Sequence, residues 1–121
     1  MSGRRSIQPG QRIKADGYNE VFEDSVYMNV GSGVYRTPLN GRYRFGGWVG
    51  VWGVGGGVDV YVCGGDGRRE KVASSVVPGV GRVDYVVWDC PEGLTVWVEV
   101  EGWTGCWDTT FNVGFEGELV D

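Results

Sequence analysis

Apolar and polar residues alternate with a period of two along most of the chain. In residues 41–45, Tyr43 and Phe45 fall on one face and two arginines fall on the other. Aliphatic residues alternate with polar or aromatic ones in the same way over residues 58–63 and 94–101. This spacing predicts β-strands that bury one face and expose the other. A slip of one residue would turn the valines to solvent, so the register of each strand is well defined.

Glycine-rich turns separate these segments. Asn40-Gly41, residues 64–67 and residues 91–93 combine Gly with Asn, Asp or Pro, which are the residues that favour turn conformations. Residues 72–87 are predicted to form two strands broken by Pro78-Gly79. Many short strands with turns between them are typical of a sandwich or a barrel.

Residues 48–52 differ from the other predicted strands because they are apolar on both faces. Trp48 and Trp52 lie on one face, and Val49 and Val51 lie on the other. Such a strand is expected to be covered on both sides, for example by the opposite sheet and by a neighbouring subunit. This segment is a first indication of oligomerisation.

The composition supports a single all-β domain. The chain has 121 residues, with 22 Val and 23 Gly against three Leu and two Ala. Residues that favour helices are therefore rare, whereas β-branched and aromatic residues, which suit a pleated surface, are common. A chain of this length is long enough to enclose one hydrophobic core.

Residues 1–20 differ in composition from the rest, so we expect a short extended N-terminal arm there and a β-sandwich domain over residues 21–121. The first fourteen residues carry four positive charges and no acidic residue. Such an arm would bind an acidic surface, and a solvated tail is the alternative. The candidate anchoring residues are Arg4, Arg5, Ile7, Arg12, Ile13, Lys14 and Tyr18.

The rest of the chain is acidic, which limits its partners. After residue 14, seven basic residues stand against sixteen acidic ones, a net charge of −9. An acidic body repels a phosphate backbone, so we expect no nucleic-acid partner. There is no apolar run long enough to span a bilayer, and no apolar stretch of a signal peptide, so we expect no membrane partner and synthesis in the cytoplasm.

The cysteines and glycines offer no catalytic or metal-binding motif. His is absent, and Cys63, Cys90 and Cys106 form no closely spaced pair, which argues against a zinc site, a disulfide framework and a Cys-His nucleophile. We expect these cysteines to be small buried apolar residues. The Gly-rich residues 53–57 lack the following helix that a phosphate-binding loop requires. The sequence therefore predicts no cofactor and no metal.

Paired carboxylates are the remaining candidates for catalysis. Glu99 with Glu101, and Glu116 with Glu118, are spaced like the acid and base of a glycosidase, but each pair alternates with apolar or small residues. A solvent-exposed sheet face produces the same spacing, and we interpret both pairs in that way. Because no nucleophile, base and orienting partner occur together, we expect that the protein is not an enzyme.

Tryptophans form the candidate ligand-binding loop. Trp103 and Trp107 flank Gly105 in a short loop. Exposed aromatic side chains in a loop serve either as a platform on which a sugar stacks or as an anchor in an interface. Packing of both rings onto the domain's own core is the alternative.

Residues 33–45 carry a family resemblance. They read Gly-Val-Tyr-Arg-Thr-Pro-Leu-Asn-Gly-Arg-Tyr-Arg-Phe. In C1q/TNF-like domains, a Gly-x-[Phe/Tyr]-x-x-Pro-x-x-Gly-x-Tyr-x-Phe stretch marks a strand, a turn and the next strand, so the chain from about residue 22 onward resembles that family. Residues 94–100 and 115–119 resemble its last two strands, with Glu118 where an apolar residue is usual. The resemblance implies a jelly-roll β-sandwich.

The same resemblance implies a homotrimer. Proteins of this family form compact trimers in which aromatic side chains of the inner sheet meet around the threefold axis. The implied core or trimer-interface residues are Tyr35, Tyr43, Phe45 and Phe115, and the segment that is apolar on both faces adds Trp48 and Trp52.

The arm carries a second resemblance. The opening residues 7–19, in which Ile13, Ala15, Tyr18 and Asn19 match the pattern, resemble the short Ile-x-Ala-x-x-Tyr/Phe-Asn segments that begin many structural proteins of tailed phages. With the jelly roll, this predicts a virion protein: a trimeric capsid decoration protein, head-stabilising or head-fibre, on the capsid surface. Its arm would bind the major capsid protein or another virion protein. The alternative is the receptor- or carbohydrate-binding tip of a phage fibre, with Trp103 and Trp107 on a host surface glycan.

Overall fold

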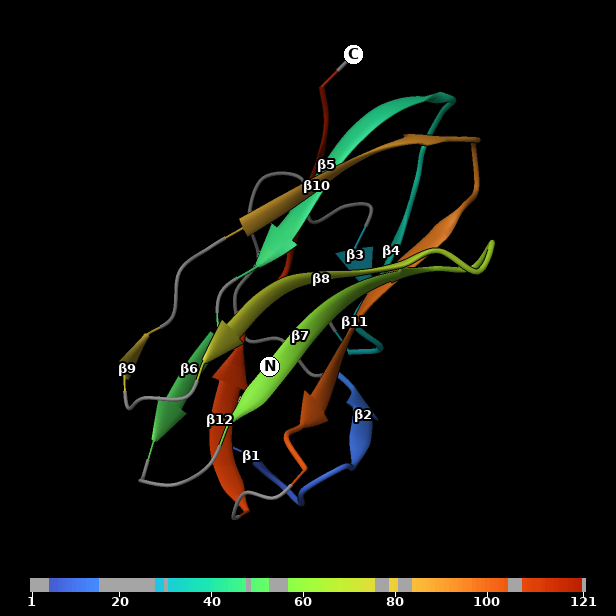
Figure 1. Ribbon diagram of the computed structural model, residues 1–121. Coiled ribbons are helices and arrows are strands. Elements are labelled where there is room, and N and C mark those ends of the chain that lie inside the picture. Colours follow the sequence, from blue (N-terminus) through green and yellow to red (C-terminus); the bar gives the residue numbers. More distant parts are fainter. Residues whose placement is uncertain are drawn as a thin grey trace.

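Every regular element in the computed structural model is a β-strand within the residues that it describes (Figure 1). These are residues 5–15, 28–29, 31–47, 49–52, 57–75, 79–80, 84–104 and 108–120. In this part of the chain, no helix is long and apolar enough to cross a membrane. The expected all-β class is therefore confirmed.

The strands are short, and the longest lie in the middle of the chain and near its C-terminal end. In chain order they are β1 (Arg5–Ile7), β2 (Arg12–Lys14), β3 (Met28–Asn29), β4 (Val34–Arg36), β5 (Gly41–Gly47), β6 (Val49–Trp52), β7 (Val58–Gly64), β8 (Arg69–Ser75), β9 (Gly79–Val80), β10 (Asp84–Cys90), β11 (Thr95–Gly102), β12 (Thr109–Val113) and β13 (Glu116–Leu119).

The strands form three antiparallel sheets. The four-stranded sheet has the order β1-β12-β6-β9, and the three-stranded sheet has the order β10-β5-β13. The six-stranded sheet has the order β3-β4-β11-β7-β8, with β2 also paired to β11. Neighbours such as β1 and β12 come from distant parts of the chain, so the sheets are linked by crossovers and not by hairpins alone.

The valines that alternate along the sequence form the centre of the core. Strand β11 pairs with β7 so that Val98 lies opposite Val62 and Val100 lies opposite Val60. These four side chains are fully buried, and one buried cluster joins them to Phe111 of the four-stranded sheet and to residues of the three-stranded sheet. The predicted strands and their register are therefore confirmed in this region.

Aromatic side chains fill the part of the core under the three-stranded sheet. The ring of Phe45 lies 5.5 Å from that of Tyr35 and 5.9 Å from that of Tyr43, and Phe115 lies 6.2 Å away. Gly117 opposite Phe45 makes room, because a Cβ there would lie 2.7 Å from the Phe45 ring. These four aromatic residues, expected in the core or at a trimer interface, are core residues of the single chain.

Residues 5–15, which we call the strap, belong to the sheets. Strand β1 pairs with β12 and β2 pairs with β11, so the strap joins two sheets through one tight turn (Figure 1). In that turn Gly10 has a φ of 76°, which favours glycine. The side chains of Ile7 and Ala15 are buried in the core. The expected domain boundary at residue 20 lies outside the described residues.

The region of residues 72–87 differs from the prediction of two strands. Between β8 and β10 lies the short strand β9, in which Gly79 and Val80 pair with Val51 and Gly50 of β6. Gly79, which was taken as part of a break, thus begins a strand, because a distant strand supplies hydrogen-bond partners that local sequence does not reveal. Pro78 lies outside the described residues.

Candidate functional site

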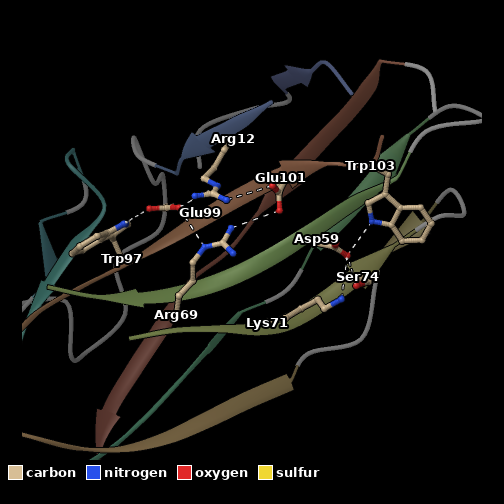
Figure 2. Close-up of polar contacts among 9 residues, drawn as sticks. All are labelled: Arg12, Asp59, Arg69, Lys71, Ser74, Trp97, Glu99, Glu101 and Trp103. Carbon is tan, nitrogen blue, oxygen red and sulfur yellow. Dashed lines mark hydrogen bonds and ion pairs between the residues drawn. The ribbon is translucent and has the colours of Figure 1, made fainter. Parts of the chain in front are cut away.

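The outer face of the six-stranded sheet carries charged and aromatic side chains. Burial alternates along β11, so Trp97, Glu99 and Glu101 point away from the core while the valines between them point into it. Asp59 and Tyr61 of β7 share that outer face. We call this surface the polar strip, and its members are Arg12, Lys14, Asp59, Tyr61, Arg69, Lys71, Trp97, Glu99, Glu101 and Trp103. Figure 2 draws all of them except Lys14 and Tyr61.

Acidic residues of the polar strip lie on its central strands, and basic residues lie on the flanking strands. The register places Lys14 and Arg12 of β2 opposite Glu99 and Glu101 of β11. Beyond β7, strand β8 adds Lys71. Across the sheet the strip therefore has an acidic centre between two basic borders, and each carboxylate has a cation within 4 Å.

Two arginines and two glutamates form the centre of the strip (Figure 2). Arg12 lies 3.9 Å from a Glu99 oxygen and 3.5 Å from a Glu101 oxygen. Arg69 lies 3.7 Å from each carboxylate. The carboxylates are 21% and 30% exposed. Ion pairs this long and this solvated contribute at most about 1 kcal/mol each to stability.

Aromatic rings accompany these charges. Trp97 Nε1 donates a hydrogen bond of 2.9 Å to Glu99, which orients the indole. Lys14 Nζ lies 5.8 Å from the centre of the same ring. The Arg69 guanidinium lies only 3.5 Å from the centre of the Tyr61 ring, so that ring is covered. Of the two rings, Trp97 therefore offers the more accessible surface.

Cys63 and Cys90 are buried free thiols, as expected. Burial, together with the negative charge of Glu99, raises the pKa of Cys63 to about 11. Burial also raises the pKa of Cys90. Both thiols are therefore protonated near neutral pH and are poor nucleophiles. Cys106 lies outside the described residues.

Trp103 lies at the other end of the polar strip from Trp97 (Figure 2). Its Nε1 donates a hydrogen bond of 2.9 Å to Asp59, which also accepts one of 2.6 Å from Ser74. One face of the indole packs on Gly57, where a Cβ would lie 2.8 Å from the ring. Trp103 remains partly exposed. It is thus fixed to the domain without being buried in the core.

The outer face of the three-stranded sheet is different, because it exposes apolar side chains. Among the described residues, all the large apolar side chains that are exposed lie on or next to this sheet, with exposures from 42% to 56%. We call this surface the apolar face, and its apolar members are Tyr85 and Val87 of β10 and Val120, which follows β13. Leu119 pairs with the buried Tyr43 and points to the opposite side, and Leu39 lies just before β5.

The charges of the apolar face are paired within the sheet. Arg42 lies 3.3 Å from Asp89, which faces it across β5 and β10. Arg44 forms an ion pair with Glu118 of β13, and its guanidinium lies 4.7 Å from the centre of the Tyr85 ring. Apolar side chains and neutralised charges are therefore mixed on this face.

The structure separates the residues that were expected to anchor the arm. Ile7 of β1 is buried, and Ile13 of β2 packs against the core. Arg12 and Lys14 are exposed on the polar strip, and Arg5 lies in β1. Four other candidates, Arg4, Tyr18, Trp48 and Trp107, lie outside the described residues, and Trp52 belongs to β6 with its side chain outside them.

Sequence reasoning selected Trp103 but missed Trp97, Tyr61 and Arg69. The alternation of residues 94–101 already placed Trp97 on the same face as the two glutamates, which was the available signal. The interpretation of Glu99 and Glu101 as a solvated face was incomplete, because arginines of two other strands cover them. In the described part of the chain, no cluster of His, Cys, Asp or Glu is suited to hold a metal ion.

Comparison with known proteins shows the fold. No protein-family model and no curated protein sequence matches the chain. Among solved structures, the globular domain of zebrafish complement 1qA protein matches with a TM-score of 0.59 and 13% identity, over 98% of this chain and 97% of that one. A carbohydrate-binding module, TmCBM61 in complex with β-1,4-galactotriose, matches with a TM-score of 0.37 and 17% identity, over 97% and 90% of the chains. The first match shows that the chain has a C1q-like jelly-roll fold.

Proposed function

We propose that this chain is a non-catalytic virion protein that assembles as a homotrimer and decorates the surface of a phage capsid. The resemblance of residues 33–45 to the C1q/TNF-like family supports the trimer, because that resemblance implies trimeric proteins. The resemblance of residues 7–19 to the first residues of tailed-phage structural proteins supports the virion role.

The apolar face is the observation that carries this proposal. Exposed apolar side chains that gather on one sheet mark an interaction surface more strongly than scattered ones. Arg42 and Arg44 already have carboxylate partners in the same sheet, and the carboxylate of Glu116 accepts a hydrogen bond from the Tyr85 hydroxyl, so a second copy can cover the face while these charges keep their partners. The occupant that we propose is a second copy of this chain that presents a different part of its surface, because a closed ring of three requires a head-to-tail contact.

The interface must extend beyond the apolar side chains. A stable protein interface buries roughly 1,000 Å² or more in total, which three apolar side chains do not supply. The ion pairs Arg42–Asp89 and Arg44–Glu118 therefore lie within the proposed interface or at its rim. Tyr43 and Phe45 are excluded from it because both are fully buried in the single chain.

Attachment to the capsid is proposed through the basic residues Arg4 and Arg5, which would bind the major capsid protein or another virion protein. Arg12 is engaged with Glu99 and Glu101, and Ile7 belongs to the core, so neither is a suitable anchor. Three copies of a weak contact act together in a trimer and give useful avidity.

Sedimentation velocity tests the assembly. We expect the wild-type protein to sediment at about three times the 13.2 kDa mass of one chain. Val87→Glu places a charge in the proposed interface and should shift the protein to monomer. Thr104→Glu adds the same charge at an exposed site away from the apolar face and should leave the trimer intact. A monomeric wild-type protein, or a trimeric Val87→Glu variant, would overturn the proposed interface.

Co-sedimentation with phage capsids that lack their decoration protein tests the virion role. The wild-type protein should pellet with such capsids, and a variant that combines Arg4→Glu with Arg5→Glu should remain in the supernatant. Deletion of residues 1–20 is a poorer test, because it also removes β1, β2 and the buried Ile7. Wild-type protein that stays in the supernatant would contradict the capsid role while leaving the trimer untouched.

A further inference from the structure

We propose that the polar strip binds an extended, uncharged carbohydrate chain, with Trp97 and Trp103 as the platforms on which sugar rings stack. This inference goes beyond the proposed role in assembly, because it concerns another face of the molecule. It stands whether the protein is a monomer or a trimer.

The spacing of the two indoles favours a chain of several sugars over a single sugar. Trp97 lies on β11, and Trp103 directly follows that strand, six residues later. A strand rises about 3.3 Å per residue, so the two residues are roughly 20 Å apart along the sheet. Figure 2 shows them at opposite ends of the group, with carboxylates and guanidinium groups between them.

Both platforms are held in place before any ligand arrives. The indole N–H of Trp97 is bonded to Glu99, and that of Trp103 is bonded to Asp59, each at 2.9 Å. The packing of one face of Trp103 on Gly57 leaves the opposite face as the side available for contact. Rings that are fixed in advance lose little conformational freedom on binding, and this favours affinity.

The presence of both charge signs side by side in the strip argues that the ligand is uncharged. A polyanion that approached Arg12 or Arg69 would meet the carboxylates of Glu99 and Glu101, and a polycation would meet the two arginines. A hydroxyl group both donates and accepts hydrogen bonds, so it can bond to carboxylates and guanidinium groups that lie side by side. A neutral glycan carries such hydroxyls together with C–H faces that stack on aromatic rings.

The rings of the strip differ in how readily a sugar can reach them. The Tyr61 ring is covered by the Arg69 guanidinium at 3.5 Å, so we assign it no stacking role. Lys14 Nζ is 5.8 Å from the Trp97 ring centre, and its flexible side chain can move aside. The guanidinium of Arg69 then presents a flat, hydrogen-bonding surface midway between the two indoles.

Affinity electrophoresis tests the proposal. The wild-type protein is run in native gels that contain a soluble neutral polysaccharide, namely galactan, mannan or mixed-linkage glucan, with heparin and chitosan as charged probes. We expect at least one neutral polysaccharide to retard the protein. Retardation by none of the three, or only by heparin or chitosan, would overturn the proposal.

Substitutions at Trp97 assign the site. Titration calorimetry with oligosaccharides of the retarding polysaccharide should show binding at least about tenfold weaker in Trp97→Ala than in the wild type. Trp97→Phe, which keeps an aromatic ring, should stay close to the wild type. Equal losses in both variants would contradict a stacking role. If Trp97→Ala lowers the melting temperature, Trp97→Leu provides the same test with an apolar side chain of larger volume.

Oligosaccharides of different length distinguish the contribution of Trp97 from that of Trp103. A short oligosaccharide that reaches only Trp97 should bind Trp103→Ala as well as it binds the wild type, whereas a longer one should bind the variant more weakly. Absence of any gain with length in the wild type would contradict a two-platform strip. Val87→Glu serves as the control for assembly, because its affinity for a short oligosaccharide should equal that of the wild type even if the trimer is lost.

Discussion

The two outer sheet faces of this protein arise from the same alternation but become different surfaces. On β11 the outward Glu99 and Glu101 meet arginines contributed by β2 and β8. On β10 the outward Tyr85 and Val87 have β5 on one side and, within the described residues, no paired strand on the other. The alternation decides which residues point outward, whereas the neighbouring strands decide which charged groups meet there.

The edge strands β8 and β10 differ in the same way. Each has seven residues, and each ends its sheet in the described part of the chain. Strand β8 carries Arg69, Glu70 and Lys71 beside a register shift, which are features that discourage pairing with another chain. Strand β10 instead exposes Tyr85 and Val87. Its edge is the one at which association between copies is expected.

Substitutions on opposite sides of the three-stranded sheet should differ most in their effect on the free energy of unfolding. Phe45→Ala removes a fully buried ring from the aromatic cluster and should lower the free energy of unfolding by about 4 kcal/mol. Val87→Ala, on the exposed side of the neighbouring strand, should change it by less than about 0.5 kcal/mol in the dissociated chain. Urea denaturation at low protein concentration measures both. Similar losses would mean that Val87 is covered within the monomer.

Ile7→Ala tests whether the strap is a structural part of the domain. Because Ile7 is 1% exposed, we expect a loss of about 3 kcal/mol in the free energy of unfolding, measured by urea denaturation. Ser6→Ala, an exposed neighbour in the same strand, is the control and should have little effect. An unchanged free energy of unfolding in Ile7→Ala would show that the strap detaches readily. That result would support the expectation that residues 1–20 form an extended arm.

The buried thiol under the polar strip predicts a dependence on alkaline pH. The pKa of Cys63 is about 11 in the folded chain against an ordinary value of 9.0, so the unfolded chain releases this proton first. Its contribution to stability is complete below about pH 9 and is lost as the pH rises toward 11. Denaturation midpoints across this range should fall less in Cys63→Ala than in the wild type. Identical slopes would contradict the shift.

Substitutions in the exposed ion pairs should have the smallest effect on the free energy of unfolding, and added salt should weaken that effect further. Arg12→Ala removes two long, solvated ion pairs and should lower the free energy of unfolding by less than about 1 kcal/mol. The difference from the wild type should vanish at about 1 M salt. Arg42→Ala, which breaks the pair with Asp89 on the other face, is the matched control and should behave alike. A loss that persists at high salt would mean that Arg12 acts through packing of its side chain.

The parts of the fold that depend on local alternation could be predicted from the sequence. The valines of β7 and β11 and the aromatic pair Tyr43 and Phe45 take the predicted orientations, because a period of two fixes which side faces the core. The strap could not be predicted from its own residues. Its strands β1 and β2 pair with β12 and β11, which lie near the other end of the chain, and local composition does not indicate such pairing.

The candidate sites show the same limit. Alternation placed Trp97, Glu99 and Glu101 on one face, but it did not reveal that Arg69 and Arg12 approach them from two different strands. The apolar face depends likewise on which strand lies at an edge, a property of the whole sheet. The sequence therefore predicted which side chains point outward, but it did not predict which of them the strands bring together on one surface.

The strap has a consequence for how quickly the chain can fold. Its residues pair with β11 and β12, and the bond from Arg12 to Glu101 spans 89 positions of sequence. Contacts between such distant residues close large loops before they yield any stabilisation, and domains rich in them fold slowly. The six-stranded sheet thus stays incomplete until β11 has been synthesised, and the four-stranded sheet until β12 has been synthesised. Until then, valine-rich strands remain without their final neighbours, a state in which chaperones would have time to bind.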